Sequence, residues 1–368
     1  SKKFGVVAVA VGLIVGLAPA AQATDLTGAG ASFPALLIEE CKVVFNKATG
    51  HSLTYAGSGS GTGRDGSDKQ LGHIWFSDTA HTGSTARASL VHIPAAAAPI
   101  ALLHNLPARS QLYLSPETAA KIFAGEITRW NDPAILKDNN RSVKQVVYKK
   151  DRNGDLVKDA KGNAVVLRTS QKNIAYTLPN QPIKVIYRSD KSGTSGNFTA
   201  WLRGVAPTTW TKPQNDTFVT AFPGAVASDP VGLRAASGSA GVGQLAKDTR
   251  YSITYNEVSF AKSYNLQVVN VINPAGKEVA PATEGVLTAF AAATINDSTG
   301  LVTFDYKSKL AGAYPFTATT YGMVLTGADK GANTASVKKM FEYHAFECPK
   351  LFPEQGMAVT TKDSELGK

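Results

Sequence analysis

Short apolar runs alternate with amphipathic stretches along most of the chain. Runs that are rich in β-branched residues and bounded by turn residues predict strands, and apolar residues spaced by three or four positions predict helices. We therefore expect strands at residues 25–27, 53–56, 73–77, 95–103, 183–187 and 268–272, with an extended segment at 314–325. We expect helices at residues 37–48, 115–123, 196–203, 285–293 and 337–346, the last being the final helix of the chain.

This alternation predicts an α/β architecture with mainly parallel sheets, in which ligands bind at the carboxyl ends of strands. The length of 368 residues, with 43% hydrophobic residues and 33 glycines, fits about two domains of a soluble globular protein. Residues 141–181 interrupt the pattern with a polar insertion, which we interpret as a hairpin excursion. A turn rich in Asp and Asn within it is not a calcium loop, because Leu156 and Gly162 replace the required Gly and Glu.

The first 23 residues are typical of a secretory signal peptide. They contain two lysines, an apolar stretch at residues 6–17 and the cleavage pattern Ala21-Gln22-Ala23. The apolar stretch is too short for a comfortable membrane span, and no second one follows. Because no cysteine lies near the cleavage point, we expect no lipid anchor. The mature chain is therefore expected to start near Thr24, to have no transmembrane span and to be periplasmic or secreted.

The net charge of +10, or +8 without the two leader lysines, favours anionic partners in general. We expect no nucleic-acid partner, because there is no run of five or more basic residues and no basic stripe with interleaved aromatics. The six scattered histidines predict no metal site, and the lack of G-x-S-x-G and H-E-x-x-H argues against the common hydrolase routes. The two cysteines, Cys41 and Cys348, either pair in an oxidising compartment or remain free thiols.

The clearest chemical signal is a Gly/Ser turn between a predicted strand and a predicted helix, at residues 188–196. A helix start offers unpaired backbone N–H groups and a partial positive charge, and Arg188 could add a fixed bidentate cation. Ser32 and Phe33 lie at a second such helix start. Residues 57–64 alternate glycines with hydroxyls, which predicts either a nest of N–H donors or a flexible surface loop. Taken singly, each signal is also typical of an ordinary capped helix or turn.

Several segments together resemble the periplasmic phosphate-binding protein of the high-affinity phosphate ABC transporter. They are LTGAGASFP at 26–34, YAGSGSG at 55–61, FSD at 76–78, IFAGEITRWND at 122–132, RSDKSGTS at 188–195 and YPFTATT at 314–320. They follow the order of that family and cover most of the mature chain. The sequence departs from the family where residues 61–66 prolong the glycine-rich loop, since the family usually starts a helix there.

The resemblance implies a type II periplasmic binding protein, with two α/β lobes that are joined by a hinge and close on a single ion. Lobe one would comprise residues 24–98 plus 270–368, and lobe two residues 99–269. Both cysteines would then lie in lobe one, which is consistent with a disulfide between them. The resemblance also implies a monomer that binds inorganic phosphate without a cofactor and delivers it to the membrane permease of an ABC transporter.

Carried over position by position, the family's motifs imply one binding site. Its ligand residues would be Ser32, Phe33 through its backbone N–H, Ser60, Asp78, Arg188, Ser192, Gly193 and Thr194. Asp190 would hold the Arg188 guanidinium in place. An aspartate that faces an anion makes sense if the anion brings a proton: phosphate keeps at least one near neutral pH, whereas sulfate keeps none. Asp78 would therefore select phosphate over sulfate, although arsenate is protonated like phosphate and would not be rejected.

Two other functions remain open from the sequence. The first is a secreted phosphatase of the DING branch of this family, in which His73 or His81 could assist a water molecule near Asp78. The predicted mature start does not carry the DING tetrapeptide. The second is an extracellular phosphate scavenger or adhesin without a transporter. Sulfate, molybdate or arsenate could replace phosphate as the bound oxyanion.

Overall fold

The computed structural model describes residues 23–107, 111–229, 231–352 and 358. The predicted signal peptide, apart from Ala23, lies outside the described residues. The strands are β1 (Asp25–Gly30), β2 (Ser52–Ala56), β3 (Ile74–Ser77), β4 (Leu90–His104), β5 (Leu112–Leu114), β6 (Arg141–Tyr148), β7 (Val166–Ile174), β8 (Lys184–Arg188), β9 (Arg234–Ala236), β10 (Ser252–Glu257), β11 (Gln267–Ile272), β12 (Glu278–Val279), β13 (Thr294–Ile295), β14 (Val302–Thr303) and β15 (Thr317–Leu325). The helices are α1 (Ala35–Thr49), α2 (Ser60–Lys69), α3 (Pro116–Phe123), α4 (Pro133–Asn139), α5 (Gly193–Val205), α6 (Phe218–Ala221), α7 (Gly238–Asp248), α8 (Ser259–Tyr264), α9 (Thr283–Phe290), α10 (Thr334–Phe346) and α11 (Cys348–Leu351).

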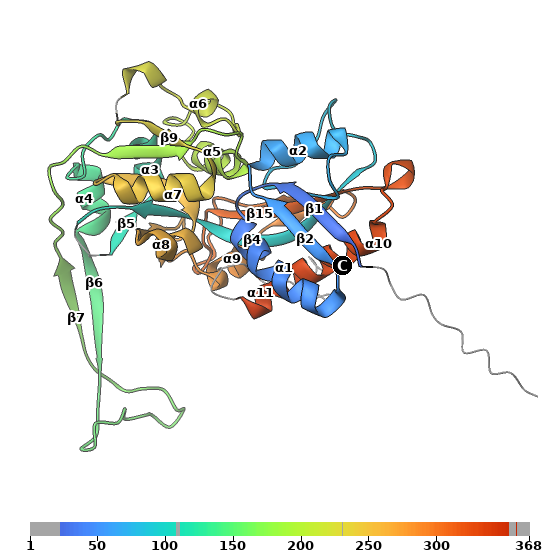
Figure 1. The fold of residues 1–368 in the computed structure, drawn as a ribbon. Coiled ribbons are helices and arrows are strands. Elements are labelled where there is room, and N and C mark those ends of the chain that lie inside the picture. Colours follow the sequence, from blue (N-terminus) through green and yellow to red (C-terminus); the bar gives the residue numbers. More distant parts are fainter. Residues whose placement is uncertain (1–22, 108–110, 230, 353–357, 359–368) are drawn as a thin grey trace, which may run out of the picture.

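One sheet of 11 strands runs through both lobes of this α/β fold (Figure 1). Its main path has the order β2-β1-β3-β15-β4-β10-β8-β9. The outer strand pairs β1–β2, β1–β3, β8–β9 and β8–β10 are parallel. At the centre of the sheet, β15 pairs antiparallel with β3 and β4, and β4 pairs antiparallel with β10. The fold class is therefore the predicted two-lobed α/β class.

Strand β4 links the two lobes. Its first part, up to Pro99, pairs with β15, and its last part, from Ile100 to His104, pairs with β10. We call the part built on β1, β2, β3 and β15 lobe one, and the part built on β8, β9 and β10 lobe two. The predicted lobe boundaries at residues 98/99 and 269/270 remain a proposal. Because β4 is continuous, the lobes are joined by backbone that is itself part of the sheet.

Most predicted elements are present, and their ends follow local chemistry. Helix α1 ends where Gly50 adopts a left-handed conformation, with φ at 76°, which glycine accepts without strain. Helix α3 begins after Ser115, whose hydroxyl accepts the Thr118 N–H. The prediction that 337–346 is the final helix was wrong, because α11 follows α10.

The glycine-rich segment after β2 is a helix rather than a loop. Helix α2 spans Ser60–Lys69, so the loop interpretation of residues 57–64 was wrong beyond Gly59. The expectation that residues 61–66 prolong the loop, where the family starts a helix, was therefore also wrong. The chain enters this helix through Gly59, which has a φ of 107°. Residues with a Cβ rarely adopt this angle, so the glycine permits the sharp turn into α2.

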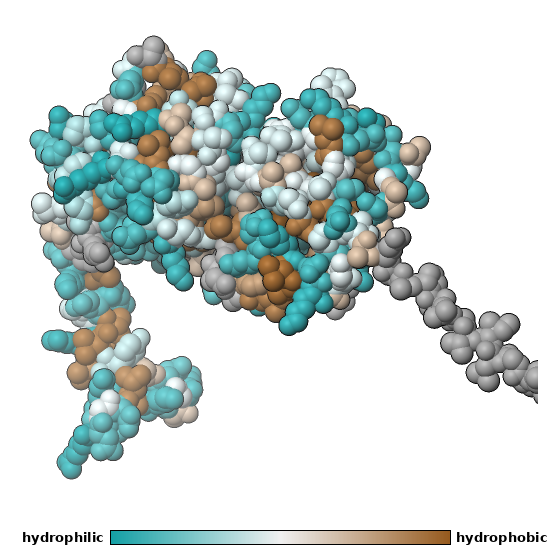
Figure 2. Space-filling model, viewed as in Figure 1, coloured by the Kyte–Doolittle hydropathy of each residue, from teal (hydrophilic) through white to brown (hydrophobic). Residues whose placement is uncertain are grey.

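The polar insertion forms the predicted hairpin. Strands β6 and β7 pair antiparallel from Arg141↔Ile174 to Tyr148↔Val166 and project from lobe two as a two-stranded arm (Figure 1). Apolar residues are exposed on this arm, among them Leu156 and Leu167 (Figure 2). The arm is remote from the convergence of helix starts described below. Over the described residues, no helix is long and apolar enough to span a membrane.

Cys41 on α1 and Cys348 at the start of α11 form a disulfide, which settles the open question of their pairing. The bond joins residues separated by 307 positions, so it closes a very long loop in the unfolded chain. Both cysteines are buried, at 3% and 0% exposure.

We expect the double variant Cys41→Ala/Cys348→Ala to lose about 4–5 kcal/mol of unfolding free energy, because removing a long-loop disulfide enlarges the entropy of the unfolded chain. Urea unfolding with and without a reductant measures this. The reductant should lower the midpoint of the unmodified protein and leave that of the variant unchanged. Equal midpoints for both proteins without reductant would contradict the prediction.

Candidate functional site

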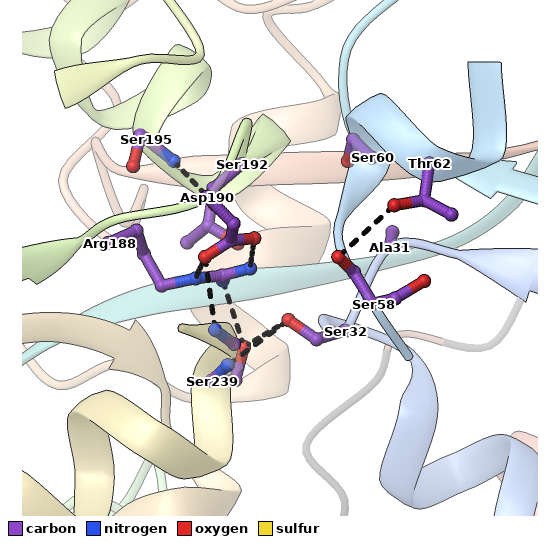
Figure 3. A network of polar contacts seen from close by, with 12 residues as sticks. Ala31, Ser32, Ser58, Ser60, Thr62, Arg188, Asp190, Ser192, Ser195 and Ser239 are labelled. Atoms are coloured by element: carbon purple, nitrogen blue, oxygen red, sulfur yellow. Dashed lines mark hydrogen bonds and ion pairs between the residues drawn. The ribbon is translucent and has the colours of Figure 1, made fainter. Parts of the chain in front are cut away.

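Four helix N-termini meet between the lobes. Helices α1 and α2 come from lobe one, and α5 and α7 from lobe two (Figure 3). The Ser32 hydroxyl before α1 lies 2.8 Å from the hydroxyl of Ser239 in the first turn of α7, and it accepts the Ser239 N–H at 3.2 Å. On the opposite side, the Gly61 N–H of α2 donates to the Lys191 carbonyl before α5. Helix starts that converge in this way concentrate N–H donors and partial positive charge.

Arg188, at the end of β8, places a buried cation at this convergence. Its Nε and Nη2 donate to the two carboxylate oxygens of Asp190 at 2.8 and 2.6 Å, and its Nη1 donates to Ser239 Oγ at 3.3 Å. Burial alone would lower the pKa of Arg188, but Asp190 raises it above its ordinary value, so the guanidinium stays charged. Asp190 therefore holds the guanidinium, as predicted, while Nη1 lies against the helix starts.

Asp78, directly after β3, is 3% exposed. Its backbone N–H donates to Ser60 Oγ at 3.0 Å, and its Oδ2 accepts from Ser60 Oγ at 3.4 Å and from Thr194 Oγ1 at 3.5 Å. Burial raises the pKa of Asp78 to about 7, and Thr320, Arg188 and Ser60 oppose that shift only in part. In the part of the chain that the structure describes, its Oδ1 has no hydrogen-bond partner. This buried oxygen can accept a proton-bearing group.

A second buried carboxyl group, which the sequence analysis missed, is that of Glu257 at the end of β10. Its Oε1 accepts from Ser239 Oγ at 3.2 Å and from Thr194 Oγ1 at 3.4 Å. Thr194 thus lies between Glu257 and Asp78. Ser239 was missed as well, although Ser237-Gly238-Ser239 has the same strand–Gly/Ser–helix pattern as residues 188–196. That repeated pattern was the available signal.

The other predicted ligand residues lie in the same place. Ser192 caps α5 by accepting the Ser195 N–H at 3.2 Å, and Gly193 begins that helix. Phe33 follows Ser32 in the chain just before α1, and its side chain packs in the hydrophobic core. Hydrogen bonds thus connect Ser60 and Thr194 with Asp78, and they connect Ser32 with Arg188 through Ser239. Their binding of an anion remains a proposal.

The two lobes touch along a line beside the site. Arg64 on α2 forms an ion pair with Asp216, which follows α5, at 2.5 Å. Thr79 Oγ1 receives a hydrogen bond from Arg64 at 2.7 Å and donates one to Asp216 at 2.9 Å. We call these three residues, with the Gly61–Lys191 backbone contact, the interlobe seam. They hold lobe one against lobe two.

Glycine is required where the lobes approach most closely. A Cβ on Gly193 would lie 2.5 Å from Ser60 Oγ and 2.8 Å from the Asp78 Cβ, both on the opposite lobe. A Cβ on Gly59 would lie 2.4 Å from Asp190 Oδ2. Real Cβ atoms do not come this close to other atoms, so any larger residue would separate the helix starts.

The histidines considered in the sequence analysis are engaged elsewhere. The His73 ring accepts the Thr27 N–H at 3.0 Å, and the His81 ring lies 2.8 Å from the Asp68 carboxylate. No contact brings either ring to Asp78 among the described residues. Within those same residues, no group of three or more His, Cys, Asp or Glu side chains is placed to hold a metal ion.

A family model for a PBP superfamily domain matches residues 17–339. The phosphate-binding protein PstS 3 of Mycobacterium tuberculosis is 31% identical over 294 residues, which cover 76% of this chain and 68% of that protein. The phosphate-binding protein PstS of Haemophilus influenzae is 28% identical over 334 residues, which cover 90% of this chain and 87% of that protein.

Solved structures share the fold. A high-affinity periplasmic phosphate-binding protein of the DING type, solved with bound phosphate, superposes with a TM-score of 0.63. Its sequence is 20% identical, and the match covers 91% of this chain and 90% of that one. At this identity the likeness concerns the fold alone.

Proposed function

Because this chain belongs to the PBP superfamily and to its PstS phosphate-binding proteins, we propose that it binds inorganic phosphate between its lobes for delivery to an ABC importer. Proteins of this kind are substrate-binding proteins rather than enzymes. The proposal extends to a periplasmic or secreted monomer whose protein partner is the membrane permease of the transporter. No cofactor is needed for this role.

One observation carries the choice of ligand. A charged guanidinium and four helix starts, which attract anions, share one buried place with the carboxyl group of Asp78, which repels anions that lack a proton. Monohydrogen phosphate resolves this conflict, because its O–H can donate to the free Oδ1 of Asp78 while its other oxygens accept from Arg188 and the N–H groups. Sulfate has no proton to give and would leave that oxygen unpaired.

The proposed ligand residues divide into two sets. Donors to the phosphate oxygens are Ser32 Oγ, the Phe33 N–H, Ser60 Oγ, the Arg188 guanidinium, Ser192 Oγ, the Gly193 N–H and Thr194. Asp78 is the acceptor. A micromolar dissociation constant corresponds to about 8 kcal/mol, which several charge-assisted hydrogen bonds in a dry site can supply.

Calorimetric titration tests the proposal. The protein is unfolded and refolded with its disulfide intact, to remove any bound ion, and is then titrated with phosphate, arsenate and sulfate. We expect a micromolar or tighter dissociation constant for phosphate, binding of arsenate, and sulfate binding weaker by at least about 10²-fold, since an unpaired buried carboxylate and charge repulsion both act against sulfate. Sulfate that binds as tightly as phosphate would refute the selectivity mechanism.

A secreted phosphatase gains no support from the described residues. A nucleophilic Ser32 would need a base, and its contact is with the Ser239 hydroxyl, while His73 and His81 bond elsewhere. Ser60 contacts the carboxyl group of Asp78, which we assign to the proton of the ligand. We therefore propose that weak phosphatase activity is not the role of this chain. Steady hydrolysis of p-nitrophenyl phosphate that disappears in Asp78→Asn would reverse this conclusion.

A further inference from the structure

Glu257 is a buried carboxyl group that none of the proposed ligand roles explains. It is 1% exposed, and its Oε1 already accepts from Ser239 and Thr194 in the first turns of α7 and α5. Its Oε2 is shielded from solvent and has no hydrogen-bond partner among the described residues. The Glu257 carboxyl group therefore lies at the first turns of α5 and α7, and its Oε2 is available to a ligand.

The surroundings of Glu257 favour its neutral form. Burial raises the pKa of Glu257 to about 8, the Arg188 charge from β8 opposes this, and Asp78 beside β3 adds to it. The Arg188 charge is largely committed to Asp190. From its own strand, Tyr255 is neutral, because burial raises its pKa to about 12. From helices α5 and α7, the hydroxyls of Thr194 and Ser239 donate to the carboxyl group, and within the described ranges no hydrogen bond or ion pair joins a cationic side chain to it.

We propose that Glu257 is a further ligand residue, whose neutral carboxyl group donates a hydrogen bond from Oε2 to the bound phosphate. This inference rests on the proposed function. Oε1 accepts from Ser239 and shares the single hydroxyl proton of Thr194 with Asp78, whereas Oε2 has no hydrogen-bond partner among the described residues, so we assign the proton to Oε2. Asp78 and Glu257 then have opposite roles on either side of Thr194: Asp78 accepts the proton of the ligand, and Glu257 gives a hydrogen bond to an oxygen of the ligand.

The charge state of Glu257 is expected to affect phosphate affinity. An ionised Glu257 would place a second unneutralised carboxylate beside a doubly charged anion, and the repulsion would weaken binding. A neutral Glu257 turns the same side chain into a donor and adds no negative charge beside the ligand. Phosphate affinity is therefore expected to fall as pH rises through the titration of Glu257, on the alkaline side of neutrality.

Two substitutions separate donation from charge. Glu257→Gln keeps a donor and cannot ionise, whereas Glu257→Ala removes the donor. At about pH 6 we expect Glu257→Gln to bind phosphate within about threefold of the unmodified protein and Glu257→Ala to bind about 10- to 100-fold more weakly, since a hydrogen bond to a charged group is lost. Between about pH 6 and about pH 9, the unmodified protein should lose affinity more steeply than Glu257→Gln, because Asp78 titrates in both proteins whereas residue 257 titrates only in the unmodified one. Glu126→Gln, an exposed carboxyl-to-amide change, serves as the control.

Calorimetry with inorganic phosphate in buffers of different ionisation enthalpy gives a second readout. On the alkaline side of the titration, the unmodified protein should take up a proton as it binds, and Glu257→Gln should take up less. An infrared band of a protonated carboxyl group should be present in the phosphate complex at neutral pH and absent in the complex of Glu257→Gln.

The outcomes distinguish the two levels of the proposal. If the unmodified protein binds no phosphate, the proposed function itself fails. If it binds phosphate but Glu257→Gln and Glu257→Ala match it in affinity and pH profile, Glu257 is only structural and this inference fails. Glu257→Gln that binds much more tightly at about pH 6 would also overturn it, because the native group would then be an ionised, repelling carboxylate. Thermal unfolding identifies a variant that fails to fold, and Glu257→Gln, being nearly the same shape, remains decisive in that case.

Discussion

Arg188→Ala is expected to weaken phosphate binding by about 10²- to 10³-fold, since truncating one partner of a buried charged contact costs about 2–5 kcal/mol. The loss should extend equally to arsenate, because the guanidinium attracts any oxyanion and does not sense its protonation. Calorimetric titration of the refolded variant with both ions measures the loss. Arg188→Lys should fall between the two proteins, since lysine keeps the charge but lacks the planar fork that Asp190 holds.

Arg203→Ala is the matched control for this result. Arg203 lies near the other end of α5 and donates to the carbonyls of Pro207 and Trp210, away from the helix start. Its loss should leave phosphate affinity within about twofold of the unmodified protein, because exposed contacts of this kind contribute little. Arg188→Ala with the affinity of Arg203→Ala would show that the buried guanidinium does not touch the ligand.

Asp78→Asn is expected to reduce the ratio of phosphate to sulfate affinity by about 10²- to 10⁴-fold. The side-chain amide can donate to sulfate, so sulfate binding should strengthen while phosphate loses an acceptor for its proton. Competition calorimetry with the two ions gives the ratio directly. Asp297→Asn, at an exposed position, is the control. A ratio unchanged in Asp78→Asn would exclude Asp78 as the selective acceptor.

The same mechanism fixes the sign of a pH effect in the unmodified protein. Burial raises the pKa of Asp78 to about 7, so the carboxylate form that rejects sulfate prevails above that pH and is lost as pH falls below it. The ratio of phosphate to sulfate affinity should therefore fall in the unmodified protein as the pH is lowered through about 7. In Asp78→Asn the ratio should be low at every pH.

The site was predictable from sequence wherever its residues stand at the end of an apolar strand or just before a helix. Arg188 and Asp78 end apolar strands, and Ser32 and Ser192 precede helices with regular apolar spacing, so local pattern placed all four. Their meeting at one point was implied by family resemblance rather than by local pattern.

Helix α2 was missed because its glycines lower local helix propensity, although tertiary packing requires them. A Cβ on Gly63 would lie 2.3 Å from the Phe76 carbonyl oxygen, and one on Gly66 would lie 2.8 Å from the Trp75 ring. The helix must lie directly on the sheet, and only glycine allows that distance. Such a requirement comes from strands elsewhere in the fold and is invisible in the local sequence.

Strand β10, and Glu257 with it, was missed for a related reason. All six of its residues are buried, yet several are polar, so no apolar run marks the strand. Thr254 donates to the Ile186 carbonyl and Asn256 to the Ser239 carbonyl, so partners distant in sequence make the burial of these groups tolerable. Sequence pattern cannot reveal partners that the fold alone supplies.

The interlobe seam bears on how fast the protein exchanges its cargo. Asp78, Arg188 and Thr194 are each at most 3% exposed, and the Arg64–Asp216 pair joins the lobes beside them. Because these groups are buried, we expect an ion held among them to leave when the seam opens, so that its dwell time depends on that opening as well as on its own hydrogen bonds. A protein partner that separates the two lobes would therefore speed the release of the bound ion, which dissociates slowly from the isolated protein.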